Sequence, residues 1–253
     1  FRWRRHDDGR WIGVLGEDIV QLTTRSSKVH IVTASKRAET IKSEVFRYLR
    51  LDDDLRAIQD RLGCDPNLAR SIESYPGLRI LRQDPWETLI GFILSAVSNI
   101  NKISTTMESI SRSLGKKIVM GNEVRYSFPT AEILAKTNEV HLRELGCGFR
   151  APYVLHAARA VHQGILRLGE LSSTPYPDVL MKLTDVYGVG DKIADCVMLF
   201  SLDHTEAFPV DRWIQRALQE WYGPLDVRSY RKCRDWAQKR FGTDAGYANH
   251  YLF

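Results

Sequence analysis

One lysine and one aspartate stand close to a glycine-rich turn in the second half of the chain. Lys192 follows the segment Gly188-Val-Gly-Asp191, and Asp211 ends the segment Phe208-Pro-Val-Asp211. Glycines at this spacing let the backbone turn sharply and bring bare N–H groups to the start of the next helix, where a phosphate binds readily. For Gly188-Val-Gly190 alone, an ordinary turn between two helices, with Lys192 a solvated residue of the first helical turn, is an equal alternative.

A lysine and a carboxylate in this order suit amine chemistry. The amine can attack an electrophilic carbon and form a Schiff base, while the carboxylate stabilises positive charge that develops beside it. We expect Lys192 to be partly buried at the positive end of a helix, where the neutral amine is favoured. Asp211 also fits the N-cap of a helix that begins at Arg212, a role worth about 1 kcal/mol. The two roles of Asp211 are compatible.

Length and composition are compatible with a broad class of soluble proteins. The chain has 253 residues, 43% of them hydrophobic and 26% charged, which is typical of a soluble protein with one large or two smaller domains. No apolar run approaches the roughly 20 residues that span a bilayer. Four scattered cysteines do not have the spacing of a metal or iron–sulfur site and do not require disulfides, so we expect a reducing intracellular compartment, no cofactor and no catalytic metal.

The charge and the start of the chain add two weaker expectations. A net charge of +5 permits a polyanionic partner without requiring one. The chain begins at Phe1 without a methionine and without an apolar leader, so we expect further residues upstream.

The elements that position these residues change in type once along the chain. Three short runs with strand propensity, Trp11–Leu15, Asp18–Leu22 and Val29–Thr33, predict an antiparallel meander within about the first 35 residues. From Ala38 onward the apolar spacing is helical and strand patterns nearly vanish. Asp84-Pro85 marks the start of one helix by an N-cap followed by a first-turn proline. The fold class is therefore α+β and predominantly α-helical.

Four segments in the same order resemble the 8-oxoguanine branch of the helix-hairpin-helix (HhH-GPD) DNA glycosylases. They are Phe1-Arg-Trp3, Leu81-Arg-Gln-Asp-Pro85, Gly148-Phe-Arg-Ala151 and Gly188-Val-Gly-Asp-Lys-Ile-Ala-Asp-Cys196. The resemblance covers essentially the whole chain. It implies a small antiparallel β domain with helices over residues 1–80, then a helical region over 81–253 made of two helical domains with the active site in their cleft. The helix-hairpin-helix is expected at about 178–201.

The resemblance implies a bifunctional DNA glycosylase and AP lyase that flips 8-oxoguanine out of the duplex opposite cytosine. Lys192 would attack the sugar at C1′, and the resulting Schiff base would permit β-elimination, with Asp211 stabilising the charge. Gly188, Val189 and Gly190 would bind the DNA backbone. The carbonyl groups of Thr184, Val186 and Val189 would hold a monovalent cation.

Two further groups of residues are implied by the resemblance. In the lesion pocket, Phe253 and Cys196 would stack on the flipped base beside Pro209, and Asn249 would face its Watson–Crick edge where relatives usually carry Gln. A small buried hydrophobe for Cys196 and a polar residue on a helix surface for Asn249 are the alternatives. The N7 hydrogen of the lesion would be read by a glycine upstream of Phe1.

At the vacated stack, the resemblance implies that Phe149 inserts as a wedge and that Arg150 offers forked donors to the unpaired cytosine. Outside this family, Phe-Arg at a helix start is typical of a core aromatic beside an exposed charge. Ser98, Asn99 and Lys102 would probe the stack, and Asn99 also fits an N-cap. The chain departs from its relatives here, because they carry a run of asparagines and then Arg.

The expected partner is double-stranded damaged DNA, with no membrane and a monomeric protein, so the protein would be DNA-associated in the nucleus of a eukaryote or the cytoplasm of a prokaryote. Two alternatives stay open. One is a glycosylase for an alkylated purine or a pyrimidine lesion, against which Lys192 and the missing cysteine cluster argue. The other is a non-catalytic helix-hairpin-helix module, which would need neither Lys192 nor Asp211.

Overall fold

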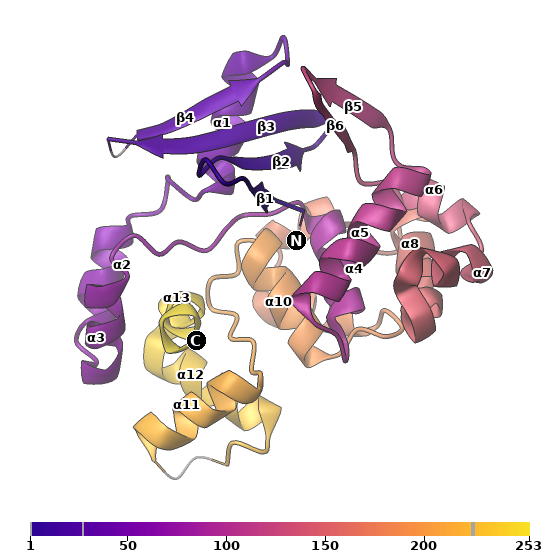
Figure 1. The fold of residues 1–253 in the computed structure, drawn as a ribbon. Helices are drawn as coiled ribbons and strands as arrows, with labels where there is room; N and C mark the ends of the chain where they lie inside the picture. The colour runs from indigo at the N-terminus through magenta and orange to yellow at the C-terminus, as the bar shows by residue number, and fades with distance from the viewer. Residues whose placement is uncertain (1, 27, 224–225) are drawn as a thin grey trace. The chain divides into compact units, whose positions relative to one another are not determined.

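The chain folds into two compact units, each built from two separate stretches of sequence. A computed structural model describes residues 2–26, 28–223 and 226–253 (Figure 1). The first unit joins Phe1–Phe46 to Leu89–Leu166, and the second joins Arg47–Thr88 to Arg167–Phe253. The division expected at residue 80 therefore falls inside the second unit, because the helices of its first stretch pack with helices near the C-terminus. Phe1, which begins one of the four family segments, lies outside the described residues.

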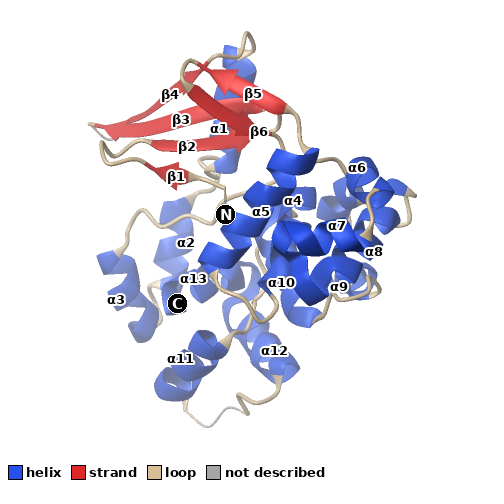
Figure 2. Ribbon diagram, turned by 45° about the vertical axis from the view of Figure 1, so that its right-hand side comes forward, coloured by secondary structure: helices blue, strands red, loops and turns tan. Residues whose placement is uncertain are grey.

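The first unit begins with an antiparallel sheet in the order β1-β2-β3-β4 (Figure 2). Its strands are β1 (Arg4–Arg5), β2 (Trp11–Leu15), β3 (Asp18–Arg25) and β4 (Lys28–Thr33). The expected meander is confirmed, with β3 three residues longer than its pattern indicates. Helix α1 (Ala38–Tyr48) lies against one face of the sheet, and its Ile41 and Val45 are buried, as are Ile12 and Val20 of the strands.

A second hairpin in the first unit was not expected. Strands β5 (Lys117–Met120) and β6 (Glu123–Tyr126) pair antiparallel across the two-residue turn Gly121-Asn122, where Gly121 has φ +58°. A Gly-Asn pair between two short alternating runs is a hairpin pattern, so the sequence did contain the information. The statement that strand patterns nearly vanish after Ala38 is wrong at this point.

Helices make up the rest of the first unit. They are α4 (Pro85–Ser95), which enters this unit at Leu89, α5 (Ile100–Leu114), α6 (Ala131–Lys136), α7 (Glu139–Leu142), the short turns η1 (Arg143–Cys147) and η2 (Gly148–Arg150), and α8 (Ala151–His162). The Asp84 carboxylate accepts the N–H of Glu87 at 2.8 Å, which confirms the expected start of α4. The buried core of these helices includes Leu89, Ile90, Ile93, Met107, Ile110, Leu134 and Val154.

In the second unit, the described residues form helices and the segments that connect them. They are α2 (Leu55–Leu62), α3 (Pro66–Ser74), η3 (Leu168–Ser173), α9 (Tyr176–Thr184), α10 (Asp191–Ser201), α11 (Arg212–Tyr222), α12 (Tyr230–Phe241), η4 (Gly242–Asp244) and α13 (Ala245–Leu252). Helix α10 is buried along most of its length and carries the lysine of interest. Across both units, no described helix is long and apolar enough to cross a membrane.

Candidate functional site

The glycine-rich turn joins α9 to α10, so the expected helix-hairpin-helix is present within two residues of its expected bounds. Gly188 has φ +88°, a conformation that favours glycine. The N–H of Val189 donates to the Val186 carbonyl at 2.9 Å, and both side chains are buried, which fixes the turn to the unit. The Val189 N–H is thus engaged within the turn and is not free for a phosphate.

The start of α10 leaves other N–H groups available. Gly190 is the N-cap, and its carbonyl accepts the N–H of Ala194 at 3.0 Å. The N–H groups of the first turn have no partner inside their own helix, and they carry the positive end of its dipole. Among the described residues, none accepts a hydrogen bond from the N–H of Gly190 or Lys192. These two groups are placed to receive an anion.

Lys192 occupies the first turn of α10 and is exposed. The expectation of partial burial is wrong, because the packed face of α10 lies on its other side, where residues 194–199 are buried. Cys196 lies one turn later and is 5% exposed. Burial raises the pKa of the Cys196 thiol; the charge of Lys192 opposes that rise, and those of Asp195 and Asp211 add to it. Lys192 and Asp211 therefore both lie within electrostatic reach of Cys196.

Asp211 is the N-cap of α11, as the sequence indicates. Its Oδ1 accepts the N–H groups of Trp213 and Ile214, both at 2.9 Å. Both bonds use the same oxygen, and no hydrogen bond from a described residue reaches Oδ2. The half-buried carboxylate is thereby held in one orientation with an oxygen left over.

Helix α10 is anchored from its opposite side by a buried carboxylate that sequence reasoning missed. Asp195 is 0% exposed and accepts hydrogen bonds from Tyr176 on α9 and Tyr230 on α12, both at 2.5 Å. Arg234 Nη1 lies 3.9 Å from the same carboxylate and 3.5 Å from Asp191. Burial raises the pKa of Asp195 to about 6, although the two tyrosines and Arg234 oppose that rise. An aspartate among apolar residues in mid-helix was the available indication.

Two residues expected in the lesion pocket are joined directly. Asn249 on α13 is 6% exposed, and its Nδ2 donates to the Pro209 carbonyl at 2.8 Å. The interpretation of Asn249 as a helix-surface residue is therefore wrong. Phe253 follows α13 and is 77% exposed. Cys196, Asn249 and Pro209 are buried in the second unit, whereas the ring of Phe253 is accessible.

In the first unit, Phe149 and Arg150 reverse the burial that is usual for such a pair. Phe149 is 50% exposed, whereas Arg150 is 7% exposed and its guanidinium lies 4.3 Å from the Phe149 ring centroid. Arg150 Nε donates to the Ala96 carbonyl at 2.6 Å, and Nη2 donates to the carbonyls of Ala96 and Val97, the latter at 2.7 Å. Nε and Nη2 of Arg150, which we expected to face a cytosine, are thus engaged by backbone carbonyls in this structure.

The backbone that Arg150 holds is strained. Val97 has φ +50°, a left-handed conformation that is unfavourable for a β-branched residue, and its side chain is 92% exposed. Such strain persists only where surrounding contacts enforce it, and it concentrates at functional sites. No sequence pattern indicated this conformation, because valine favours extended backbone.

The remaining residues of this group lie at the start of α5. Asn99 is its N-cap and accepts the Lys102 N–H at 2.9 Å, which confirms the capping role. Asn99 and Lys102 are exposed, and Ser98 is half-buried. Lys102 Nζ lies near Gly146, whose φ of +102° marks the sharp turn before Phe149. Five of the expected residues, from Ser98 to Arg150, are thus gathered on the first unit.

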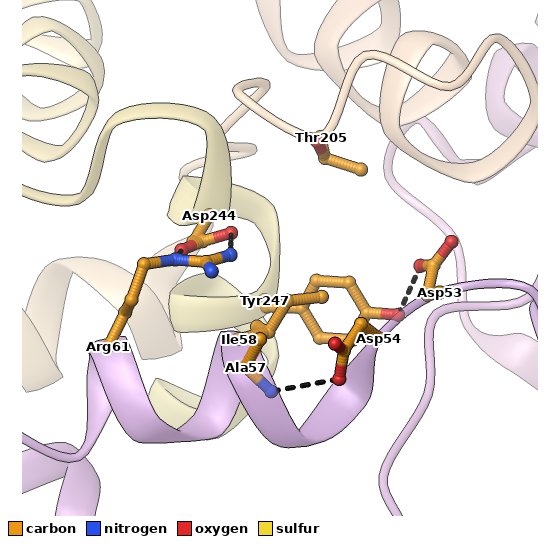
Figure 3. A pocket seen from close by; sticks show the side chains of 8 residues that line it. All are labelled: Asp53, Asp54, Ala57, Ile58, Arg61, Thr205, Asp244 and Tyr247. Carbon is orange, nitrogen blue, oxygen red and sulfur yellow. Dashed lines mark hydrogen bonds and ion pairs between the residues drawn. The ribbon is translucent and has the colours of Figure 1, made fainter.

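A hollow of about 240 Å³ in the second unit has a different character (Figure 3). Its carboxylates are engaged: Arg61 binds Asp244 through Nε at 2.6 Å and Nη2 at 2.9 Å, and Tyr247 donates to Asp53 at 2.6 Å. Lys192 and Asp211 do not line it. Because it lacks the lysine and the carboxylate of the expected chemistry, we do not place that chemistry there.

The residues whose carbonyl groups are expected to hold a monovalent cation lie at the end of α9, at Thr184, and in the turn, at Val186 and Val189. The Val186 carbonyl accepts the Val189 N–H, which leaves one lone pair for an ion. Among the described residues, no group of three or more His, Cys, Asp or Glu side chains could hold a metal.

Comparison with known protein families gives two matches that follow one another along the chain. Residues 1–89 match the N-terminal domain of 8-oxoguanine DNA glycosylase, and residues 90–242 match the HhH-GPD superfamily of base excision DNA repair proteins. The solved structure of an 8-oxoguanine glycosylase/lyase from Clostridium acetobutylicum, in complex with double-stranded DNA containing cytosine opposite 8-oxoguanine, is 36% identical with a TM-score of 0.93. It covers 100% of this chain and 86% of that protein.

Curated relatives agree with these matches. An N-glycosylase/DNA lyase from Saccharomyces cerevisiae is 36% identical over 73% of this chain, and a probable N-glycosylase/DNA lyase from Methanothermobacter thermautotrophicus is 30% identical over 75%. The matched regions span 52% and 66% of those two relatives. A 3-methyladenine DNA-glycosylase from Archaeoglobus fulgidus shares the fold with a TM-score of 0.77 at 22% identity.

Proposed function

We propose that this chain, which belongs to the HhH-GPD superfamily of base excision DNA repair proteins and begins with the N-terminal domain of 8-oxoguanine DNA glycosylases, is itself such a glycosylase. It would excise 8-oxoguanine opposite cytosine in double-stranded DNA and then cleave the strand as an AP lyase. The observation that carries the proposal is the arrangement of α10 and α11, where an exposed lysine and an oriented carboxylate both lie within electrostatic reach of the buried Cys196.

Lys192 would be the nucleophile. Its neutral Nζ attacks C1′ of the nucleotide while the glycosidic bond breaks, and the base leaves with the bonding electrons and takes up a proton. Opening of the sugar ring gives a Schiff base between Nζ and C1′. Loss of a proton from C2′ then expels the 3′ phosphate by β-elimination. The exposure of Lys192 supports this role, because the amine is accessible to a sugar that enters from solvent.

Asp211 would stabilise the positive charge that develops on the sugar. Oδ1 is held by the two N–H groups of α11, so Oδ2 keeps a fixed direction and needs no reorganisation during the reaction. The cap and the electrostatic role therefore use different oxygens of one carboxylate.

The flipped base would be held by the second unit. Phe253 would stack on one face and Cys196 on the other, where burial keeps the thiol neutral and suited to contact an aromatic base. Asn249 already donates to Pro209, so its Oδ1 is the atom that we assign to the Watson–Crick edge. An accepting oxygen suits the N–H groups of a guanine edge.

The partner strand would be contacted by the first unit. Phe149 is exposed and held on the Arg150 guanidinium, which suits a wedge that fills the vacated stack. Arg150 would contact cytosine through Nη1, because Nε and Nη2 are engaged by backbone carbonyls. Ser98, Asn99 and Lys102 would add polar contacts. Because most N–H donors of the Arg150 guanidinium are engaged, the preference for cytosine would be weaker than an unengaged guanidinium would give.

The turn before α10 would bind the DNA backbone. The N–H groups of Gly190 and Lys192 would face a phosphate, with a monovalent cation on the carbonyls of Thr184, Val186 and Val189. Such contacts set affinity and its salt dependence and carry no base information. We propose that the protein acts as a monomer associated with DNA.

Excision measurements on defined duplexes test this proposal. Duplexes would carry 8-oxoguanine opposite each of the four bases, an alkylated purine or an oxidised pyrimidine, and base release would be followed at fixed salt concentration. The proposal requires release of 8-oxoguanine, fastest opposite cytosine. Release of another damaged base in its place would establish the alternative glycosylase, and tight binding of every duplex without release would establish a non-catalytic module.

A further inference from the structure

Arginines converge on a small cavity in the first unit, away from the residues assigned to catalysis. The cavity has a volume of about 130 Å³ and lies between β1, the later part of α5, and β6. Its charged lining consists of Arg4, His6, Glu108, Arg112, Glu123 and Arg125. At about 30 Å³ per water molecule, the space holds roughly four waters or one small oxyanion.

Arg125 is the group in this lining that most needs a partner. It is 5% exposed, and its Nη2 donates to the Ile12 carbonyl at 3.2 Å. Its Nε is buried without a hydrogen-bond partner, and among the described residues no carboxylate lies within 4.0 Å of its guanidinium. A buried charge with one hydrogen bond is costly, and buried polar atoms without partners are rare enough to require an explanation.

The carboxylates near Arg125 are already committed to other cations. Glu108 lies 3.3 Å from Arg2 and 3.7 Å from Arg4, and Glu123 lies 4.0 Å from His6. Burial lowers the pKa of Arg125, and the charges of Arg4 and Arg2 lower it further, whereas Glu108 and Glu123 oppose this without cancelling it. The cluster therefore favours the arrival of a negative charge.

The charges and their exposure point to one class of ligand. The lining contains three guanidinium groups, those of Arg4, Arg112 and Arg125, and two carboxylates, so its formal charge is +1 with His6 left aside. Arg2 lies outside the lining and pairs with Glu108 at 3.3 Å. Arg112 is exposed and forms no hydrogen bond or ion pair with any described residue. Guanidinium groups match the oxygens of a phosphate in forked geometry.

We propose that this cavity is a phosphate-binding site of the first unit, formed by Arg4, Arg112 and Arg125. The ligand is a phosphate group, either free in solution or part of a nucleic-acid backbone. The inference rests on this cluster alone and does not depend on the proposed glycosylase activity.

Binding of inorganic phosphate by the whole chain tests the proposal. Equilibrium dialysis with radiolabelled phosphate would be run at constant ionic strength, so that screening does not change along the titration. We expect a saturable site whose affinity depends on Arg112, separate from any anion at the start of α10. Arg112→Gln removes one charged contact from the rim without disturbing the buried Arg125 and should weaken binding roughly tenfold or more.

The matched control is Arg159→Gln, which removes an exposed arginine of α8 in the same unit and away from the cavity. It should leave phosphate affinity unchanged. The proposal is overturned if the wild-type chain has no saturable site, or if both variants bind phosphate as well as it does.

A second arm identifies the source of the phosphate. Undamaged duplex DNA would be added to the protein with labelled phosphate bound. If DNA displaces the label from both the wild type and Arg159→Gln, the ligand is a phosphate of the nucleic-acid backbone. If the label stays bound, the ligand is a free phosphate. Both interpretations apply once a saturable phosphate site has been measured in the wild-type chain.

Discussion

The buried carboxylate on the far side of α10 makes the pH dependence of stability predictable. Burial raises the pKa of Asp195 from the ordinary value of 3.8 to about 6. Between these two values the unfolded chain has lost the proton and the folded chain retains it. Stability is therefore full below the unfolded pKa and falls as the pH rises through the folded one. A difference of about two pKa units corresponds to about 3 kcal/mol.

Asp195→Asn isolates this contribution, because the amide cannot ionise. The free energy of unfolding would be measured with urea for the wild type and the variant from about pH 4 to about pH 7. We expect the stability of the wild type relative to the variant to fall by about 3 kcal/mol over this range. Asp60→Asn, at an exposed position on α2 in the same unit, should show no such trend.

The opposite slope would refute the reasoning. If the relative stability of the wild type rose with pH, the hydrogen bonds from Tyr176 and Tyr230 would outweigh burial, and the pKa of Asp195 would be lowered. A difference that did not change with pH would mean that Asp195 titrates alike in both states. Either result would mean that ionisation of the buried Asp195 carboxylate does not destabilise the folded chain.

Three further predictions concern the site itself. Val97→Asn should relieve the left-handed strain and raise the free energy of unfolding by about 1 kcal/mol, since asparagine tolerates this conformation; unchanged or reduced stability in urea would contradict it. Asp211→Asn should keep the cap of α11 and its stability, whereas Asp211→Ala should lose about 1 kcal/mol; both should lose most of the excision rate in single-turnover assays, and full activity of the Asn variant would remove the electrostatic role. Phe253→Ala should weaken binding of 8-oxoguanine duplexes and spare undamaged ones in competition titrations, and equal loss on both would mean that the ring does not contact the lesion.

Local sequence patterns were sufficient to predict several helix starts, the meander and the hairpin. Asp84-Pro85, Asn99 and Asp211 each cap the helix that follows, because short polar side chains before a helix satisfy its first N–H groups. Strand alternation located the meander, and the glycine at position 188 located the hairpin.

Features that depend on distant partners were not accessible in this way. The orientation of Arg150 is set by the carbonyls of Ala96 and Val97, 54 and 53 positions earlier in the chain. Asp195 depends on tyrosines of two other helices. Exposure of Lys192 was misjudged because a helix start can point toward the core or away from it, and only packing decides which. The same holds for the burial of Asn249.

The two compact units divide the chain differently from the change of sequence pattern near residue 80. Residues 47–88 follow the sheet in sequence but pack with helices near the C-terminus, so a boundary drawn from a change of pattern could not locate it. Long-range packing decides which stretches share a core, and composition carries little information about it.

Borohydride trapping tests the central claim, that Lys192 forms a covalent Schiff base during excision. The chain would be incubated with a duplex containing 8-oxoguanine opposite cytosine, or with the matched guanine duplex, and reduced during turnover, with Lys192→Gln in parallel. We expect a stable protein–DNA adduct with the 8-oxoguanine duplex alone, attached at Lys192, and none with the variant, which should still bind DNA. An adduct of equal yield with Lys192→Gln, or excision by the wild type without any trapped adduct, would contradict the account.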